Sequence, residues 1–416
     1  MNTILLFVLP AALGLAQISD SGLSFDQLAQ TALTQNKSLQ AAREQLRQAE
    51  ARLTQAGLRP NPSLDISRST DVIFGNEGEN GFAVVVSQPF ETGGKRTKRM
   101  RVAEAEVEVI KAEIADAERQ LTGQLKTAYL AAIETAARLN SLERTRGISQ
   151  QMVQVMNVRL TSGDASRLDS HLLLAENNRV EAQRLQAESR LTGQLLEIRR
   201  FAGLSPNATL SLKPVVPAAS IVRDETALVE MALRSRPDLQ AARLREALSD
   251  AGVALARSQA APNITGSVRY AREPNVSRLQ PRAFDKESVL DFGISIPLPF
   301  SNREQGNIRE ASSKVVQART EREALEHAIR IEVAIALGRY QSASRSLELI
   351  RGGIVQEAEE GVRITQLAYR LGSLRLVDVL FQQRSLLDSQ IAELSAQAEI
   401  TAAHAALEFA VGMRLN

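Results

Sequence analysis

The sequence contains no cysteine and no tryptophan, and aromatic residues make up only 4 % of its 416 residues. The lack of cysteine excludes structural disulfides, thiolate metal sites and a lipid anchor on an N-terminal cysteine. The scarcity of aromatic side chains leaves little material for a thick globular core. Lysine and arginine number 50 against 48 aspartate and glutamate, and this balance argues against a nucleic-acid partner.

Long apolar runs are also scarce. After Ala16, no apolar stretch approaches the roughly 18 to 20 residues that a membrane-spanning helix needs. Residues 1–16 are predicted to be a signal peptide, because an apolar run is followed by Pro10 and by the small residues Gly14 and Ala16. A buried N-terminal strand or helix is the alternative. If such an exported protein lies in a membrane, it must cross it with strands.

Proline is missing from two long stretches of the chain. None occurs between Phe90 and Ser205 or after Pro299, so nothing interrupts a helix there. We therefore expect long helices at 93–160 and 302–372. Apolar residues in the first recur at alternating steps of four and three, which is typical of coiled coils; they are Ala103, Val107, Ile110, Ile114, Ala117 and Leu121.

The chain is predicted to be a tandem duplication. The segment Leu39–Arg43, LQAAR, recurs letter for letter at Leu239–Arg243, and other landmarks keep the same order. The first repeat covers 17–204 and the second 224–416, joined by a linker at 205–223. The predicted elements are a first helix, a β-hairpin at 63–90, a long helix at 93–160 and a helix at 166–203, then a helix, a hairpin at 263–298, a long helix at 302–372 and a helix at 374–412.

Local signals predict where some helices begin. Ser24 with Gln27 is typical of a capping box, and so is Ser301 with Glu304 at the start of the second long helix. Pro237 predicts a kink or break within the first helix of the second repeat.

The hairpin segments alternate between apolar and polar residues. Leu290, Phe292 and Ile294 are apolar, whereas Asp291 and Gly293 between them are polar or small. This period of two predicts strands with one apolar face, and each run has about the 10 residues that cross a bilayer. Four strands cannot close a barrel, whereas two copies supply eight and three supply 12, which leaves room for a pore. A small soluble sheet packed on the helices is the alternative.

Five cations crowd the start of the first long helix, where the macrodipole disfavours positive charge. They are Lys95, Arg96, Lys98, Arg99 and Arg101. We expect a compensating partner, either lipid headgroups at a membrane boundary or the nearby Glu104 and Glu106.

No catalytic or metal-binding pattern is present in the sequence. The histidines His171, His327 and His404 are far apart and have no ligand-like neighbours. Neither a phosphate-binding loop nor a nucleophile-and-base arrangement is recognisable. We therefore expect no enzyme activity, no cofactor and no metal site.

Two segments resemble the TolC family of outer membrane efflux proteins. They are Ala368–Leu380, AYRLGSLRLVDVL, and Ser87–Arg96, SQPFETGGKR. The likeness extends over essentially all of the mature chain, and the second segment is more similar to the heavy-metal branch than to the multidrug branch.

The resemblance implies a mainly α fold with a small β part. In this family a homotrimer forms a 12-stranded transmembrane β-barrel and a coiled-coil α-barrel of 12 helices, located in the outer membrane with a periplasmic extension. Its partners are a periplasmic adaptor protein, an inner membrane pump and outer membrane lipid. The expected function is a passive exit duct of a tripartite efflux system, with metal cations among the candidate cargoes. A soluble periplasmic coiled-coil scaffold or adaptor is the alternative.

The same resemblance assigns an aperture residue. Asp378 aligns with a family carboxylate that rings the periplasmic aperture and attracts cations; a solvated helix residue is the plainer interpretation. A second aperture acid in some members corresponds to Phe381 here.

The resemblance also assigns residues at the helix tips. Asp169 and Tyr369 match a pair that links neighbouring coils in the closed state, or they are simply surface residues. The arginine that joins this pair in the family corresponds to Leu374. Gly163 and Gly372 match turn glycines where the adaptor docks, and tight reversals favour glycine.

Overall fold

The computed structural model describes residues 22–70, 80–163, 166–215, 224–276, 284–371 and 373–415. The predicted signal peptide, part of the linker and Gly372 lie outside these ranges. The elements, in chain order, are α1 (Phe25–Gln35), α2 (Lys37–Ala56), β1 (Ser63–Thr70), β2 (Asn80–Phe90), α3 (Lys95–Thr161), α4 (Arg167–Ala202), α5 (Glu225–Ser235), α6 (Pro237–Gln259), β3 (Ile264–Val276), β4 (Phe284–Ser295), α7 (Gln305–Arg351), α8 (Ile354–Arg370) and α9 (Leu376–Val411). The fold is mainly α with four antiparallel strands, as expected.

The chain divides into two compact units that do not coincide with the two repeats. Unit 1 comprises the described parts of Met1–Ala42, Ile114–Pro237 and Glu326–Asn416; unit 2 comprises Arg43–Glu113 and Asp238–Leu325. Each unit therefore takes segments from both repeats, and the repeats are not separate domains.

The first helix of each repeat is broken at the same place. In the second repeat α5 ends at Ser235 and α6 begins with Pro237, which suits the first position of a helix. The first repeat has no proline there, yet α1 and α2 separate at Asn36. The Asn36 side chain accepts a hydrogen bond from the backbone N–H of Leu39 at 3.1 Å, so it caps α2. The first helix was predicted to be continuous, and this was wrong.

The second long helix is also broken. It was predicted to be continuous over 302–372, but α7 ends at Arg351 and α8 begins at Ile354. Gly353 between them has a φ of 124°, which favours glycine. The predicted capping box of Ser301 and Glu304 is not formed, because α7 begins only at Gln305 and Glu304 has a φ of 59°. By contrast, the box at Ser24 and Gln27 is confirmed, with both reciprocal hydrogen bonds present.

The core of unit 1 forms where α1, α3, α4 and α9 contribute apolar side chains. Its largest buried member is Tyr129, whose hydroxyl donates to the carbonyls of Lys213 (2.6 Å) and Leu23 (3.2 Å). Buried neighbours include Leu28, Leu125, Ile198 and Leu387. A glycine inside α3 has a packing reason: a Cβ on Gly123 would lie 2.4 Å from the Phe409 ring.

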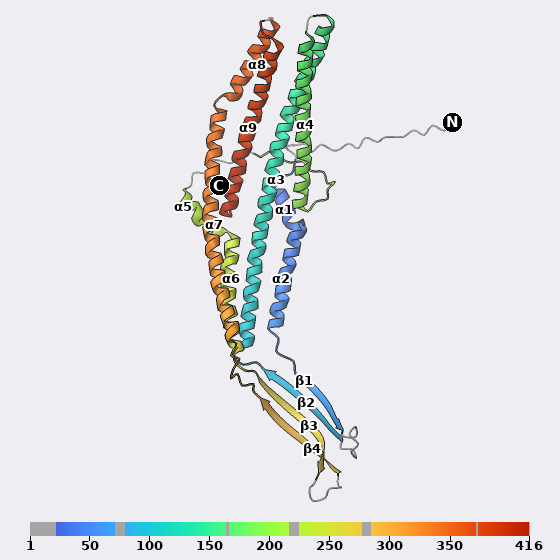
Figure 1. Ribbon diagram of the computed structural model, residues 1–416, viewed down its shortest axis with the longest axis vertical. Helices are drawn as coiled ribbons and strands as arrows, with labels where there is room; N and C mark the ends of the chain where they lie inside the picture. Colours follow the sequence, from blue (N-terminus) through green and yellow to red (C-terminus); the bar gives the residue numbers. More distant parts are fainter. Residues whose placement is uncertain are drawn as a thin grey trace, which may run out of the picture. The chain divides into compact units, whose positions relative to one another are not determined.

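Unit 2 carries the four strands in one antiparallel sheet with the order β1-β2-β3-β4, as Figure 1 shows. β4 ends at Ser295, earlier than the hairpin limit of 298 predicted from the alternation. Pro297 and Pro299 lack the backbone N–H that a strand would use in the ladder, and this explains the early end. Among the described helices, none is long and apolar enough to cross a membrane.

Candidate functional site: the helix tips, a groove and the sheet

Two pairs of antiparallel helices, α3 with α4 and α8 with α9, reverse direction at their tips in unit 1 (Figure 1). A small apolar cluster holds them together near the reversals. Met156, Leu173, Leu376 and Leu380 are buried there, and Tyr369 packs against them. The cluster contains residues from α3, α4 and α9, so it fixes the segment from which Asp378 projects.

Asp378 lies in the first turn of α9 and is half-buried, with 37 % of its side chain exposed. Its Oδ2 atom accepts a hydrogen bond from the backbone N–H of Arg375 at 3.0 Å and lies 3.8 Å from the Arg375 Nε. The carboxylate thus stabilises the helix start, where negative charge is favoured. The other carboxylate oxygen, Oδ1, has no hydrogen-bond partner among the described residues.

The position three residues after Asp378 is apolar and open. Phe381 is 72 % exposed. The chain therefore presents one carboxylate and one aromatic ring in this part of α9, in place of two carboxylates.

Tyr369 has an arginine partner that sequence reasoning missed. Arg159 in α3 donates from Nη1 to the Tyr369 hydroxyl at 3.2 Å, and its guanidinium carbon lies 5.6 Å from the ring centroid. Asp169 lies in the first turn of α4 and makes no hydrogen bond with Tyr369 among the described residues. Leu374, at the position of the family arginine, is 39 % exposed. Arg159 lies in the last turn of α3, directly before the chain reverses. This position was the signal that could have identified it as a partner of a tip residue.

Gly163 follows the end of α3 with a φ of 80°, and its backbone N–H donates to the carbonyl of Leu160 at 3.3 Å. Apart from its chain neighbours, no atom of the described residues lies within 4 Å of the place where a Cβ would be, so the backbone conformation favours glycine there. The second predicted tip glycine, Gly372, lies outside the described residues.

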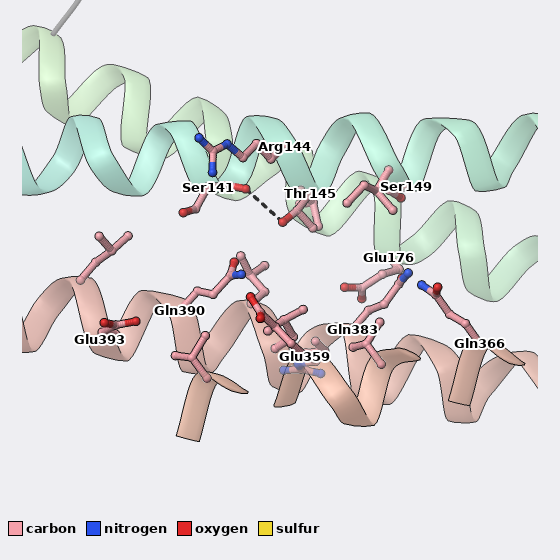
Figure 2. A pocket seen from close by; sticks show the side chains of 18 residues that line it. Ser141, Arg144, Thr145, Ser149, Glu176, Glu359, Gln366, Gln383, Gln390 and Glu393 are labelled. Atoms are coloured by element: carbon pink, nitrogen blue, oxygen red, sulfur yellow. Dashed lines mark hydrogen bonds between the residues drawn. The ribbon is translucent and has the colours of Figure 1, made fainter. Parts of the chain in front are cut away.

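A groove runs between the two helix pairs and encloses a cavity of about 440 Å³. Figure 2 shows polar side chains from α3 and α4 facing others from α8 and α9. Carboxylates of Glu176, Glu359 and Glu393 lie in its wall together with the cations Arg144 and Arg384. Glu176 is engaged by Arg179 at 2.5 Å. The wall of the groove therefore has mixed charge.

The sheet of unit 2 has two faces of opposite character. The pairing places Leu64 opposite Val86, Val86 opposite Val268 and Val268 opposite Phe292, so these apolar residues share one face. The apolar face comprises Leu64, Ile66, Phe82, Val84, Val86, Val268, Tyr270, Leu290, Phe292 and Ile294. Phe292 and Ile294 are 78 % and 77 % exposed. The face is thus left uncovered by the described part of the chain.

The opposite face of the sheet, which we call the polar face, carries charged residues, with smaller apolar ones such as Ala83 and Ala271 between them. Arg269 pairs with Asp291 across the β3–β4 ladder at 2.9 Å, and Asp65 in β1 shares this face. Within the described residues, β1 pairs only with β2 and β4 only with β3. The outer backbone groups of both edge strands are therefore open to further strands, and an open edge of this kind invites pairing with another chain.

The outer membrane efflux protein family model matches residues 28–204 and 228–413, one match in each repeat. The chain belongs to the outer membrane efflux protein family. Its members are outer membrane efflux proteins, so the protein is an outer membrane protein.

Individual relatives agree with this membership. The cobalt-zinc-cadmium resistance protein CzcC of Cupriavidus metallidurans is 24 % identical over 362 residues, which cover 86 % of this chain and 82 % of CzcC. The pyoverdine export outer membrane protein OpmQ of Pseudomonas putida is 25 % identical over 414 residues, which cover 93 % and 85 %. The crystal structure of the CmeC outer membrane channel of Campylobacter jejuni has a TM-score of 0.77 at 14 % identity and covers 93 % of this chain and 85 % of CmeC. The likeness to CzcC supports the resemblance to the heavy-metal branch.

Proposed function

We propose that three copies of this chain form the passive exit duct of a tripartite efflux system, spanning the outer membrane and the periplasm. The sheet carries this proposal. One face is apolar and exposed, the other carries charged residues, and both edges are open. Lipid tolerates neither an open edge nor unpaired backbone groups, so the edges must be closed by further copies. Three copies supply 12 strands, which enclose a pore lined by the polar face.

The soluble scaffold is the alternative to this proposal. A soluble sheet needs its apolar face covered by helices, yet Phe292 and Leu64 stay largely exposed. An exposed apolar surface of this extent marks a partner or a membrane. The open edges favour the membrane assembly, because a scaffold would expose both of them to aggregation.

The absence of cysteine from the chain allows a clean test of this assembly. A variant with one cysteine in β1 and one in β4, both on the polar face, should form disulfides between the edge strands of neighbouring copies. Ser67→Cys with Gly293→Cys is one such pair. We expect crosslinked dimers and trimers on denaturing gels for pairs whose registers match, in a urea-resistant outer membrane fraction. A freely soluble monomer without crosslinks would contradict the duct and support the scaffold.

At the helix tips, we propose that Asp378 lines the periplasmic aperture and attracts cations. Asp169 and Tyr369 would hold neighbouring coils in the closed state, and the contact of Tyr369 with Arg159 supports a role for this ring in closure. Gly163 and Gly372 would form the turns where a periplasmic adaptor docks. In this assembly the duct is passive, and the inner membrane pump supplies the energy for transport.

Metal cations are the proposed cargo, on the strength of the likeness to CzcC and of the open oxygen of Asp378. Pyoverdine is the second candidate, because OpmQ is a pyoverdine export outer membrane protein. A strain lacking the protein should accumulate cobalt, zinc or cadmium and grow poorly on these metals, and the wild-type gene should restore growth. Unchanged metal accumulation together with retention of pyoverdine inside the cell would favour the second cargo.

A further inference from the structure

The cations at the start of α3 find most of their partners within unit 2. Arg99 donates to both carboxylate oxygens of Glu91, at 2.6 and 3.2 Å, and to the carbonyls of Ala56 and Leu58 just after the end of α2. These hydrogen bonds hold the pKa of Glu91 below its usual range. Arg99 therefore needs no lipid.

The predicted carboxylate partners do not serve this role. Glu106 pairs with Arg52 of α2 at 2.8 Å. Arg96 and Lys98 donate instead to backbone carbonyls, those of Gly57 and Gly93. These carbonyls are neutral, so neither hydrogen bond brings a negative charge to the side chain.

Three cations remain around one pocket without an anion of their own. Arg59, Lys95 and Arg96 line a cavity of about 600 Å³, which we call the basic pocket. Arg59 has no partner among the described residues, and Lys95 donates only to the neutral Oδ1 of Asn263 at 2.6 Å. The one carboxylate in the wall, Glu91, is matched by Arg99. Three cations and one carboxylate give the residues that line the pocket a net charge of +2.

The basic pocket lies where the apolar surface ends. Phe90, the last residue of β2, lines the pocket and is 57 % exposed. It is paired with Ile264 of β3, and both residues lie on the same side of the sheet as the apolar face. A molecule bound in the basic pocket would place an anionic group among the cations and an apolar group along the sheet.

We propose that the basic pocket binds the phosphate headgroup of an anionic phospholipid in the leaflet next to the helices. Arginine and lysine at a membrane surface favour anionic lipids over zwitterionic ones, and guanidinium groups match phosphate oxygens. The acyl chains would lie along Phe90 and the apolar face. This inference rests on the proposed membrane insertion of the sheet.

The test uses the purified full-length assembly in nanodiscs that contain phosphatidylglycerol and phosphatidylcholine with identical acyl chains. Native mass spectrometry after mild delipidation measures which lipid stays bound. We expect a preference for phosphatidylglycerol of at least about tenfold, since each cation near an anionic headgroup adds to binding. Arg59→Gln alone should reduce this preference, and Arg59→Gln with Lys95→Gln and Arg96→Gln should abolish it.

A matched control removes three cations elsewhere in unit 2. Arg47→Gln, Lys111→Gln and Lys314→Gln change the net charge equally, and each of these side chains lies in an exposed pair within its own helix. The control should keep the preference. Equal binding of both lipids by the intact wild-type assembly, or equal loss in the control, would overturn the inference, and so would occupation of the pocket by inorganic phosphate without any lipid preference. A wild-type protein that never forms membrane assemblies would instead overturn the proposed function.

Discussion

The core of unit 1 and the sheet of unit 2 use the same apolar residue types in opposite ways. In unit 1, Ile198 and Leu125 are completely buried among helices of the same chain. In the sheet, Phe292 and Ile294 of β4 lie on the same face, and each side chain is more than three-quarters exposed. The chain covers the first surface by itself, whereas the second surface has no cover among the described residues.

The difference in burial distinguishes apolar surfaces that stabilise the fold of the single chain from apolar surfaces that contact a partner or lipid. A helix hides its apolar stripe by packing on neighbouring helices. A strand in a single-layered sheet exposes both faces, so one face here must meet lipid or another protein layer. Substitutions in the two regions should therefore fail in different ways.

The largest effect is expected in the core of unit 1. Ile198→Ala should lower the free energy of unfolding by about 2–5 kcal/mol, because it leaves a cavity that the helices cannot fill. Leu196→Ala on the same helix is the control, since Leu196 is 45 % exposed. Thermal unfolding followed by circular dichroism would compare the two variants. Equal losses at both positions would show that Leu196 is covered in the assembled protein.

A charge on the apolar face should act on membrane insertion. Phe292→Arg is expected to cost about 2–4 kcal/mol if the side chain faces the middle of the bilayer. Ser67→Arg, on the polar face of β1, adds the same charge and should be tolerated. The measurement is the fraction of protein recovered as a heat-modifiable species in outer membranes. Normal insertion of Phe292→Arg would remove the assignment of this face to lipid.

A smaller effect is expected at the junction between β2 and α3. Arg99→Gln removes the pair with Glu91, and because Arg99 is 34 % exposed the loss should be only about 1 kcal/mol. Arg101→Gln removes an equal charge from an exposed neighbour and should have almost no effect.

The same pair gives a pH dependence. The pKa of Glu91 is lowered in the folded protein, mainly by hydrogen bonds from Arg99. The pair therefore stabilises the fold above the ordinary glutamate pKa of about 4.3, and this contribution is lost as the pH falls through the lowered value. Unfolding midpoints measured from about pH 6 to about pH 3 should fall more for the wild type than for Arg99→Gln. Parallel curves would show that Glu91 is not stabilised by this arginine.

Much of the fold could be predicted because its signals are local and repeated. Proline-free stretches indicated the long helices, and alternation of apolar residues indicated the strands. The break at Asn36 was missed although the repeat aligns it with Arg236, directly before Pro237. Once one copy breaks at a proline, the same geometry is expected in the other, and asparagine can cap the new helix start. The pair Gly352 and Gly353 was a further signal for a break that was overlooked.

The candidate site was less predictable, because its contacts join residues far apart in sequence. Arg159 meets Tyr369 across 210 positions, and no periodicity reveals such a pair. The partners of Arg99 are likewise backbone carbonyls at the end of another helix. Carbonyls are present at every residue, so the sequence cannot indicate which of them a cation will reach.

The smallest effect on stability is expected at Asp378. Here two roles of the carboxylate can be separated, its hydrogen bond at the start of α9 and its proposed attraction of cations at the aperture. Asp378→Asn keeps an oxygen that accepts from the Arg375 N–H and removes only the charge. The free energy of unfolding should therefore change by less than about 1 kcal/mol. Asp378→Ala also loses the acceptor. Both variants should reduce the cation preference in planar bilayers by a factor on the order of ten, because the proposed ring of carboxylates concentrates cations at the aperture.

Asp388→Asn is the matched control for this experiment, since it removes a charge from the same helix at an exposed position paired with Arg384. If selectivity falls only in the Asp378 variants, the carboxylate acts on the permeating ion. If the two substitutions at Asp378 leave selectivity unchanged while Asp378→Ala alone destabilises the tip, the carboxylate serves only to start α9. The asparagine variant decides between these outcomes because it changes the charge while it preserves the hydrogen bond.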